Sequence, residues 1–190
     1  KPLSDQIVKT IHQSDYVDRL KRQDLNRSEI RKIGFPISQQ LVEREFVIAG
    51  GTVEGALKSL QSGISFNIAG GTHHAYSTHG EAFCMLNDQA IAAQYLLDHH
   101  HAQRILIIDL DVHQGNGTAE IFKNEDRVFT FSMHGQKNYP FKKEQSDWDI
   151  PLEDKTGDER YLNVLNDTLP QLFEQVDPDF VFYLSGVDVV

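Results

Sequence analysis

Cysteine, basic charge and long apolar stretches are all scarce in this sequence, and each scarcity excludes a class of protein. Cys84 is the single cysteine, which excludes an intrachain disulfide framework and a cysteine-rich zinc finger. With 18 Lys+Arg against 28 Asp+Glu, the formal net charge of −10 argues against a protein that binds nucleic-acid phosphates and against a polybasic protein that binds membrane surfaces. No apolar run approaches the roughly 20 residues of a membrane span, and the N-terminus has no apolar signal core. We therefore expect a soluble, cytoplasmic protein with no membrane and no direct nucleic-acid partner.

Short apolar runs alternate with helical stretches from residue 64 onward. The patterns predict strands at 64–68, 104–110, 128–132 and 179–184, and helices at 88–97, 118–122 and 158–175, the last kinked or divided by Pro170. The first 60 residues are expected to be helical, with one helix starting after Ser4-Asp5 and another over 38–60. This alternation predicts an α/β fold with a mostly parallel sheet, and the 190 residues suit one domain.

Polar residues follow three of the predicted strands. In open α/β sheets, ligands bind beyond the carboxyl ends of the strands, so these residues are expected to share one edge of the sheet. They are His73-His74 after the first strand, Asp109, Asp111 and His113 at the end of the second, and Asp188 after the last. This convergence is the main argument from the residues themselves for a functional site.

Asp109, Asp111 and His113 have the period-two spacing that sends side chains to one face of an extended backbone. Carboxylates with an imidazole suit a divalent metal, and zinc, iron, cobalt or manganese would all fit this donor set. The alternative is structural: an aspartate that caps the following helix and a histidine in a hydrogen-bonded turn. The spacing alone leaves both open, and Asp188 favours the metal.

His73-His74 follow a Gly-Gly pair, and adjacent imidazoles on an irregular loop can point into the same cavity. One ring can act as a base while the other stays charged, if their partners differ. A histidine pair exposed on the surface is the other interpretation, and this chain carries another cluster of that kind at 99–101.

Four motifs together resemble the histone deacetylase family over nearly the whole chain. They are Gly70-Gly71-Thr72-His73-His74-Ala75, Phe83-Cys84-Met85-Leu86-Asn87-Asp88, Asp109-Leu110-Asp111-Val112-His113-Gln114-Gly115-Asn116-Gly117-Thr118, and Ser185-Gly186-Val187-Asp188. The His-Gln-Gly-Asn-Gly form is closer to the class IV branch and its bacterial relatives than to class I.

The resemblance implies the arginase/deacetylase fold, a three-layer α/β/α sandwich, and hydrolysis of acetyl or longer acyl groups on lysine side chains. Asp111, His113 and Asp188 match the ligands of one zinc ion per chain. The catalytic residues it implies are His73 and His74, with His74 as the proton shuttle, Asp109 as the carboxylate that holds His73, and Asn116 in the place of an aspartate of class I.

The resemblance also implies a substrate tunnel and a second ion. Phe83, preceded by Ala82, and Tyr139 match the aromatic walls around an acyl-lysine chain. A potassium ion in the family's inner site would be held by Asp109, Asp111, His113, Ser132 and Met133, several of them through backbone carbonyls. Three alternatives stay open: a deacylase of small acylated amines, a binuclear manganese hydrolase, and a non-catalytic metal-binding module of the same fold. Oligomeric state is not visible in the sequence.

Four features depart from the family pattern. Asn116 replaces an aspartate and Ala82 replaces a glycine, while Gly34 stands where class I members carry an aspartate that grips the substrate backbone. The family's C-terminal glycine-rich motif with its catalytic tyrosine is absent before Val190. We therefore expect the chain to be incomplete at its C-terminus. Loss of that tyrosine would remove an oxyanion donor, typically worth about 10²–10³ in rate.

Overall fold

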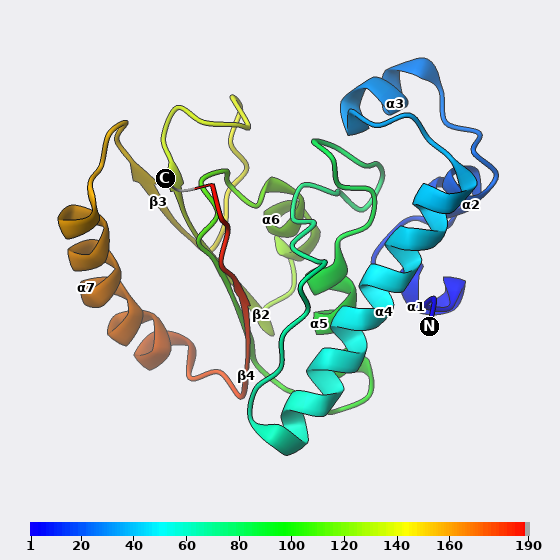
Figure 1. Ribbon diagram of the computed structural model, residues 1–190. Coiled ribbons are helices and arrows are strands. Elements are labelled where there is room, and N and C mark those ends of the chain that lie inside the picture. Colours follow the sequence, from blue (N-terminus) through cyan, green and yellow to red (C-terminus); the bar gives the residue numbers. More distant parts are fainter. Residues whose placement is uncertain (189–190) are drawn as a thin grey trace. The chain divides into compact units, whose positions relative to one another are not determined.

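The computed structural model describes residues 1–188 in two compact units (Figure 1). The first unit holds Lys1–His101 and Asn116–Ile121, and the second holds Ala102–Gly115 and the chain from Phe122 onward. The elements in chain order are α1 (Asp5–Val8), α2 (Ser14–Lys21), α3 (Arg27–Ile33), α4 (Gln39–Ser62), α5 (Asp88–Asp98), β1 (Ile105–Asp109), α6 (Asn116–Phe122), β2 (Val128–Gly135), β3 (Trp148–Leu152), α7 (Asp158–Val176) and β4 (Phe180–Leu184). Among the described residues, none of these helices combines the length and apolarity that a bilayer crossing needs.

The second unit is built on a four-stranded sheet in the order β3-β2-β1-β4, with every neighbouring pair parallel. β1 lies in the middle and is buried at all five positions, as the unbroken apolar run predicts. Its last residue, Asp109, pairs with Ser132 of β2 and with Leu184 of β4. The carboxyl ends of these strands therefore meet at one edge, where the predicted metal ligands begin.

Helix α7 covers one face of this sheet, as Figure 1 shows. Leu172 and Val176 of α7 join Leu106, Phe131 and Met133 of the strands in one apolar cluster. Burying such side chains stabilises the unit by about 25 cal/mol per Å² of apolar surface. This packing keeps the strands in a fixed position relative to one another. The loops that follow the strand ends can therefore hold a site of defined geometry.

The first unit is mainly helical, and three of its helices begin at residues whose side chains accept backbone amide hydrogens. Asn26 caps α3 through a capping box with Glu29, and Ser38 accepts the Leu41 amide at the start of α4. Asn87 caps α5 in the same way through the Ala90 amide. The N-cap at Asn87 fixes where α5 starts, and the next residue, Asp88, becomes important for the site.

The predicted strand at 64–68 is wrong. The structure shows irregular, exposed chain there, and Ile64, Phe66 and Ile68 are exposed by 66%, 84% and 101%. Alternating apolar residues indicate a strand only where a neighbouring strand supplies hydrogen bonds, and none of the described residues pairs with this segment. His73-His74 consequently follow a loop instead of the end of a strand.

The remaining differences concern Pro170, one helix start and one further strand. Helix α7 continues through Pro170 without division. The predicted helix 118–122 starts earlier, at Asn116. Strand β3 was not predicted, although Trp148, Ile150 and Leu152 recur at every second position. The predicted strands at 104–110, 128–132 and 179–184 and the helix at 88–97 are confirmed within a few residues. The expectation of a single domain stays a prediction.

Candidate functional site

Three ionisable side chains converge beyond the carboxyl ends of β1 and β4 in the second unit. One donor atom from each of Asp111, His113 and Asp188 lies within 4.8 Å of the other two. His113 Nδ1 is 2.9 Å from Asp111 Oδ1 and 3.1 Å from Asp188 Oδ2. Two carboxylates and an imidazole are donors that zinc accepts, with room for a further ligand. The donor set therefore fits a catalytic divalent metal of that kind.

The loop after β1 brings these groups together by turn geometry. β1 ends at Asp109, so Asp111 and His113 lie in a bend and not on an extended strand. Asp109 Oδ1 accepts the Asp111 amide at 3.0 Å, and Asp111 Oδ1 accepts the His113 amide at 2.8 Å. Part of the structural alternative is thus correct, because the carboxylates do stabilise a turn. The other part is wrong, because neither carboxylate caps α6, whose N-cap is Gly115 without a side-chain hydrogen bond.

Gly186 allows Asp188 to reach the same place. It has φ of +55°, and a Cβ there would lie 2.5 Å from Asp111 Cα. Any other residue would push the 185–188 loop away from the β1 loop. Asp188 Oδ1 also accepts the Val112 amide at 3.4 Å. The short Ser-Gly-Val-Asp motif therefore has a steric reason for its glycine.

Three of the residues predicted for potassium lie on neighbouring strands: Asp109 is the last residue of β1, and Ser132 and Met133 belong to β2. Asp109 is 3% exposed, and Ser132 opposite it on β2 is 2% exposed. The Ser132 hydroxyl is 3.0 Å from His134 Nδ1. Met133 is buried in the cluster under α7. A potassium ion at this place stays a prediction.

The first unit holds the histidine pair in a buried setting, so the surface interpretation is wrong. His73 and His74 are 5% and 6% exposed, and their ring centroids are 4.1 Å apart. His74 Nδ1 lies 2.6 Å from Asn116 Oδ1, while Asn116 Nδ2 donates to the Tyr76 hydroxyl at 3.0 Å. With the Asn116 oxygen facing it, Nδ1 carries the proton, and the proton acceptor of the neutral ring is Nε2. This is the tautomer that a general base needs.

Two further residues fix the loop that carries the pair. The Asp88 carboxylate accepts hydrogen bonds from the Gly71 and Thr72 amides at 3.0 and 2.9 Å. On the other side, the Thr118 amide donates to the His73 carbonyl at 3.1 Å, and a Cβ on Gly117 would lie 2.7 Å from that carbonyl oxygen. Asp88 was not predicted as a site residue from the sequence. The only indication of its role was its position as an acidic residue directly after the N-cap Asn87.

The aromatic residues predicted for substrate contact lie one in each unit. Phe83 is 61% exposed and packs against Phe35 with ring centroids 5.0 Å apart. Ala82 and Phe83 both adopt positive φ, at +43° and +66°. A Cβ on Gly34 would lie 2.8 Å from Phe83 Cε1, so Phe83 fills the space that a side chain at position 34 would need. In the second unit, the half-buried Tyr139 ring is 6.4 Å from the His113 ring, at 65°.

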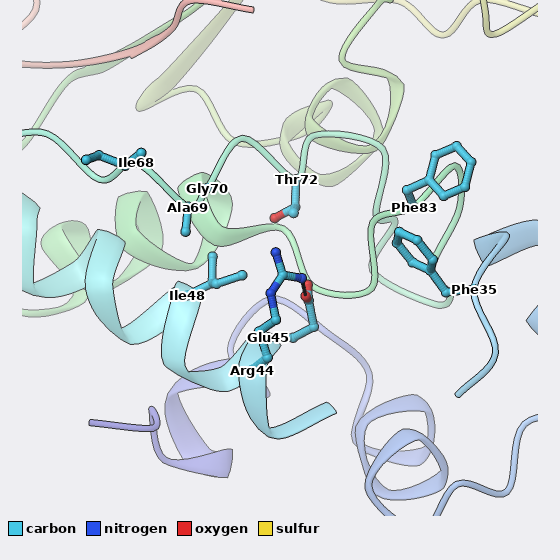
Figure 2. A pocket seen from close by; sticks show the side chains of 9 residues that line it. All are labelled: Phe35, Arg44, Glu45, Ile48, Ile68, Ala69, Gly70, Thr72 and Phe83. Atoms are coloured by element: carbon cyan, nitrogen blue, oxygen red, sulfur yellow. Dashed lines mark hydrogen bonds and ion pairs between the residues drawn. The ribbon is translucent and has the colours of Figure 1, made fainter. Parts of the chain in front are cut away.

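A cavity of about 260 Å³ opens beside Phe83 in the first unit. Figure 2 shows Phe35 and Phe83 at one end, Ile68 and Ala69 at the other, and the ion pair between Arg44 and Glu45 between these two ends. Its lining is Phe35, Arg44, Glu45, Ile48, Ile68, Ala69, Gly70, Thr72 and Phe83. A buried carboxylate was not expected here, because Glu45 lies in a helical stretch of alternating charge.

Glu45 should make stability depend on pH. Burial raises its pKa to about 7, the Asp88 charge adds to this, and Arg44 opposes it. Because the folded pKa lies above the unfolded value, ionisation destabilises the fold as the pH rises from about 4.5 to 7. We expect Glu45→Gln to leave the free energy of unfolding unchanged near pH 4.5. At pH 8 the variant should gain on the order of 1–2 kcal/mol.

Denaturant unfolding at the two pH values measures this effect. Glu43→Gln, an exposed position of the same helix, is the matched control and should change little at either pH. An equal gain at pH 4.5 and pH 8 for Glu45→Gln would contradict the assignment to ionisation.

Comparison with known proteins adds an independent observation. The sequence model of the histone deacetylase domain matches residues 1–190. The chain is 46% identical over 95% of its length to an uncharacterised protein of Picosynechococcus sp., and 36% identical over 80% to histone deacetylase Clr6 of Schizosaccharomyces pombe. It spans 60% and 40% of those relatives.

Solved structures agree with the sequence comparison. The crystal structure of a histone deacetylase homologue from Aquifex aeolicus matches 96% of this chain with a TM-score of 0.82 and 26% identity, and the chain covers 55% of it. A complex of such a homologue with SAHA matches equally well. The predicted α/β fold of this superfamily is thereby confirmed.

Proposed function

Because this chain belongs to the histone deacetylase family, we propose that it carries the metal-binding and proton-transfer residues of a zinc-dependent hydrolase that removes acetyl or longer acyl groups from protein lysines. The observation that carries the proposal is the convergence of donor atoms from Asp111, His113 and Asp188 within 4.8 Å. The relative Clr6 is a histone deacetylase by name, and the chain spans 60% and 40% of the two relatives named above, so activity of the whole protein is part of the proposal.

The three converging residues would hold one zinc ion. When bound, zinc polarises the amide carbonyl of the substrate and lowers the pKa of a coordinated water. Asp109 supports this group from the end of β1 by holding the Asp111 amide. A potassium ion near Ser132 and Met133 is part of the same proposal, as one means of balancing the buried charge of Asp109.

His74 would move the proton in this reaction. Its Nδ1 is committed to Asn116, so Nε2 can accept the proton of the attacking water and then deliver it to the leaving amine. His73, whose ring lies 4.1 Å from that of His74, would act electrostatically as the second member of the pair. Asn116 orients His74 without adding a negative charge, unlike the aspartate that many class I members carry.

The aromatic residues and the acidic charge define the proposed substrate. Phe83 and Tyr139 offer flat apolar faces to an extended, uncharged acyl-lysine chain. The net charge of −10 favours cationic partners such as lysine-rich peptides. A location in the cytoplasm stays the expectation from sequence.

One observation favours a second candidate, a deacylase of small acylated amines. Gly34 has φ of +85° and Phe83 in the space of its missing side chain. Position 34 therefore supplies no carboxylate where the resemblance places a grip on the peptide backbone. A substrate without a long peptide would not need that grip.

Metal content and deacylation, measured together, test the proposal. We expect about one zinc per chain in the natural full-length protein purified without a histidine tag, together with acetate release from an acetyl-lysine peptide. Parallel assays with a longer acyl-lysine and with an N-acetylated diamine separate the two substrate classes by kcat/KM. Protein that binds no transition metal after zinc reconstitution would contradict the proposal and favour a non-catalytic module.

A further inference from the structure

The loop that carries Tyr139 has little regular structure of its own. Residues 136–147 connect β2 to β3 through turns and bends, and much of this loop is exposed. Tyr139 nevertheless lies against His113, one of the three metal-binding residues, with ring centroids 6.4 Å apart. Some other contact must therefore hold the loop at this distance from the metal-binding group.

Gln114, the residue after His113, binds this loop at two points. Its side chain is 1% exposed, and its Nε2 donates to the Glu144 carbonyl at 2.8 Å while its Oε1 accepts the Glu144 amide at 2.9 Å. Its own backbone amide donates to the Tyr139 carbonyl at 3.3 Å. The side chain thus pairs with both backbone groups of one loop residue, as a neighbouring strand would.

Two further side chains complete the clamp. Gln114 Nε2 also donates to Asp149 Oδ1 at 2.9 Å, and Asp149 Oδ2 accepts the Ser146 amide at 2.9 Å. Lys143 Nζ donates to the carbonyls of Asn138 and Pro140, at 2.6 and 2.7 Å, on either side of Tyr139. The loop is therefore tied to the metal-binding turn through one buried carboxamide.

Only a carboxamide satisfies this site. Glutamate would place a carboxylate against Asp149 and the Glu144 carbonyl, where two hydrogens are now donated. An apolar side chain would leave the Glu144 backbone groups and the Asp149 oxygen without this buried partner, which is costly. The metal ligands, by contrast, are held by Asp109 and by one another.

We propose that Gln114 is a positioning residue that sets where Tyr139 lies relative to the metal-binding group, and thereby the affinity for the acyl-lysine chain. This inference rests on the proposed function. Because Gln114 acts on the substrate wall and not on the metal ligands, its loss should raise KM while kcat and zinc content stay near those of the unaltered protein.

Steady-state kinetics of the full-length protein test this split. Gln114→Met, similar in size and unable to make these hydrogen bonds, should raise KM for an acetyl-lysine peptide on the order of tenfold, with kcat changed less than about threefold. Gln145→Met, the same change at an exposed position of the loop, is the matched control and should leave both constants unchanged. Gln114→Asn keeps the amide on a side chain that is shorter by one methylene group, and it should raise KM as well. This variant replaces Gln114→Met in the test if the methionine variant fails to fold.

A reversal of hydrogen-bond roles separates positioning from a general loss of structure. Gln114→Glu alone brings two carboxylates together and should raise KM at least as much as Gln114→Met. Adding Asp149→Asn supplies an amide donor opposite the new carboxylate and keeps an oxygen for the Ser146 amide. The double variant should recover part of the KM loss, because the asparagine at position 149 restores the contact with residue 114 while the Glu144 carbonyl still lacks its donor.

Three results would overturn the inference. They are a fall of kcat, in place of the rise of KM, in Gln114→Met; no recovery of KM in the double variant; and Gln145→Met behaving like Gln114→Met. Failure of the proposed function looks different. In that case the unaltered protein itself would lack zinc or turnover, and the role of Gln114 in substrate affinity would fail with it.

Discussion

Replacement of Asp111 by asparagine should remove zinc and turnover together. Asparagine keeps an oxygen that can accept the His113 amide, so the turn after β1 should survive. It removes one of the two carboxylate charges that face His113, and with it most of the attraction for a divalent cation. Loss of metal assistance, which supplies several kcal/mol, should lower kcat/KM by about a thousandfold or more.

Elemental analysis and acetate release on the same preparations measure both effects. Asp126→Asn, an exposed aspartate of the same unit, is the matched control and should retain zinc and activity. Thermal unfolding should show the two variants equally folded. If Asp111→Asn kept about one zinc per chain and full turnover, the assignment of the metal ligands would be wrong.

Replacement of His74 by glutamine should lower kcat while zinc stays bound. Glutamine can still donate to Asn116 Oδ1, but it has no nitrogen that accepts and returns a proton at neutral pH. General acid–base assistance is worth about 10²–10⁴ in rate, and kcat should fall by this factor. The zinc content should equal that of the unaltered protein, because His74 is not among the three residues proposed to hold the metal.

This second variant tests whether the histidine pair and the metal-binding group serve one reaction. The control is His101→Gln, an exposed histidine after α5, which should leave kcat unchanged. Full activity of His74→Gln would show that another group transfers the proton. Loss of zinc together with activity would instead place His74 in a structural role.

The amino-acid order alone predicted much of the second unit. The buried run of β1 and the apolar runs of β2 and β4 indicate strands. The expectation of a strand buried on both faces is correct for β1, whereas β4 is an edge strand that exposes Val181 and Tyr183. The rule that ligands bind beyond strand ends then brought Asp188 to Asp111 and His113 across a long stretch of sequence. Local pattern and one topological rule were sufficient there.

Local pattern failed where the outcome depends on a partner distant in sequence. The segment 64–68 alternates as a strand should, but no described strand pairs with it. Burial of Glu45 results from the packing around the cavity in Figure 2, which a charge pattern along α4 does not reveal. The same holds for Gln114, whose amide reaches Glu144 and Asp149 across a loop of variable geometry.

The sequence by itself therefore determined which residue types are available and, near strand ends, which of them meet. Only the tertiary structure decided the protonated nitrogen of His74, through Asn116, and the close approach of the Asp111 and Asp188 loops, through Gly186. Periodicity reports how a residue faces its own element, whereas hydrogen bonds and close contacts between loops depend on distances that packing sets to a few tenths of an ångström.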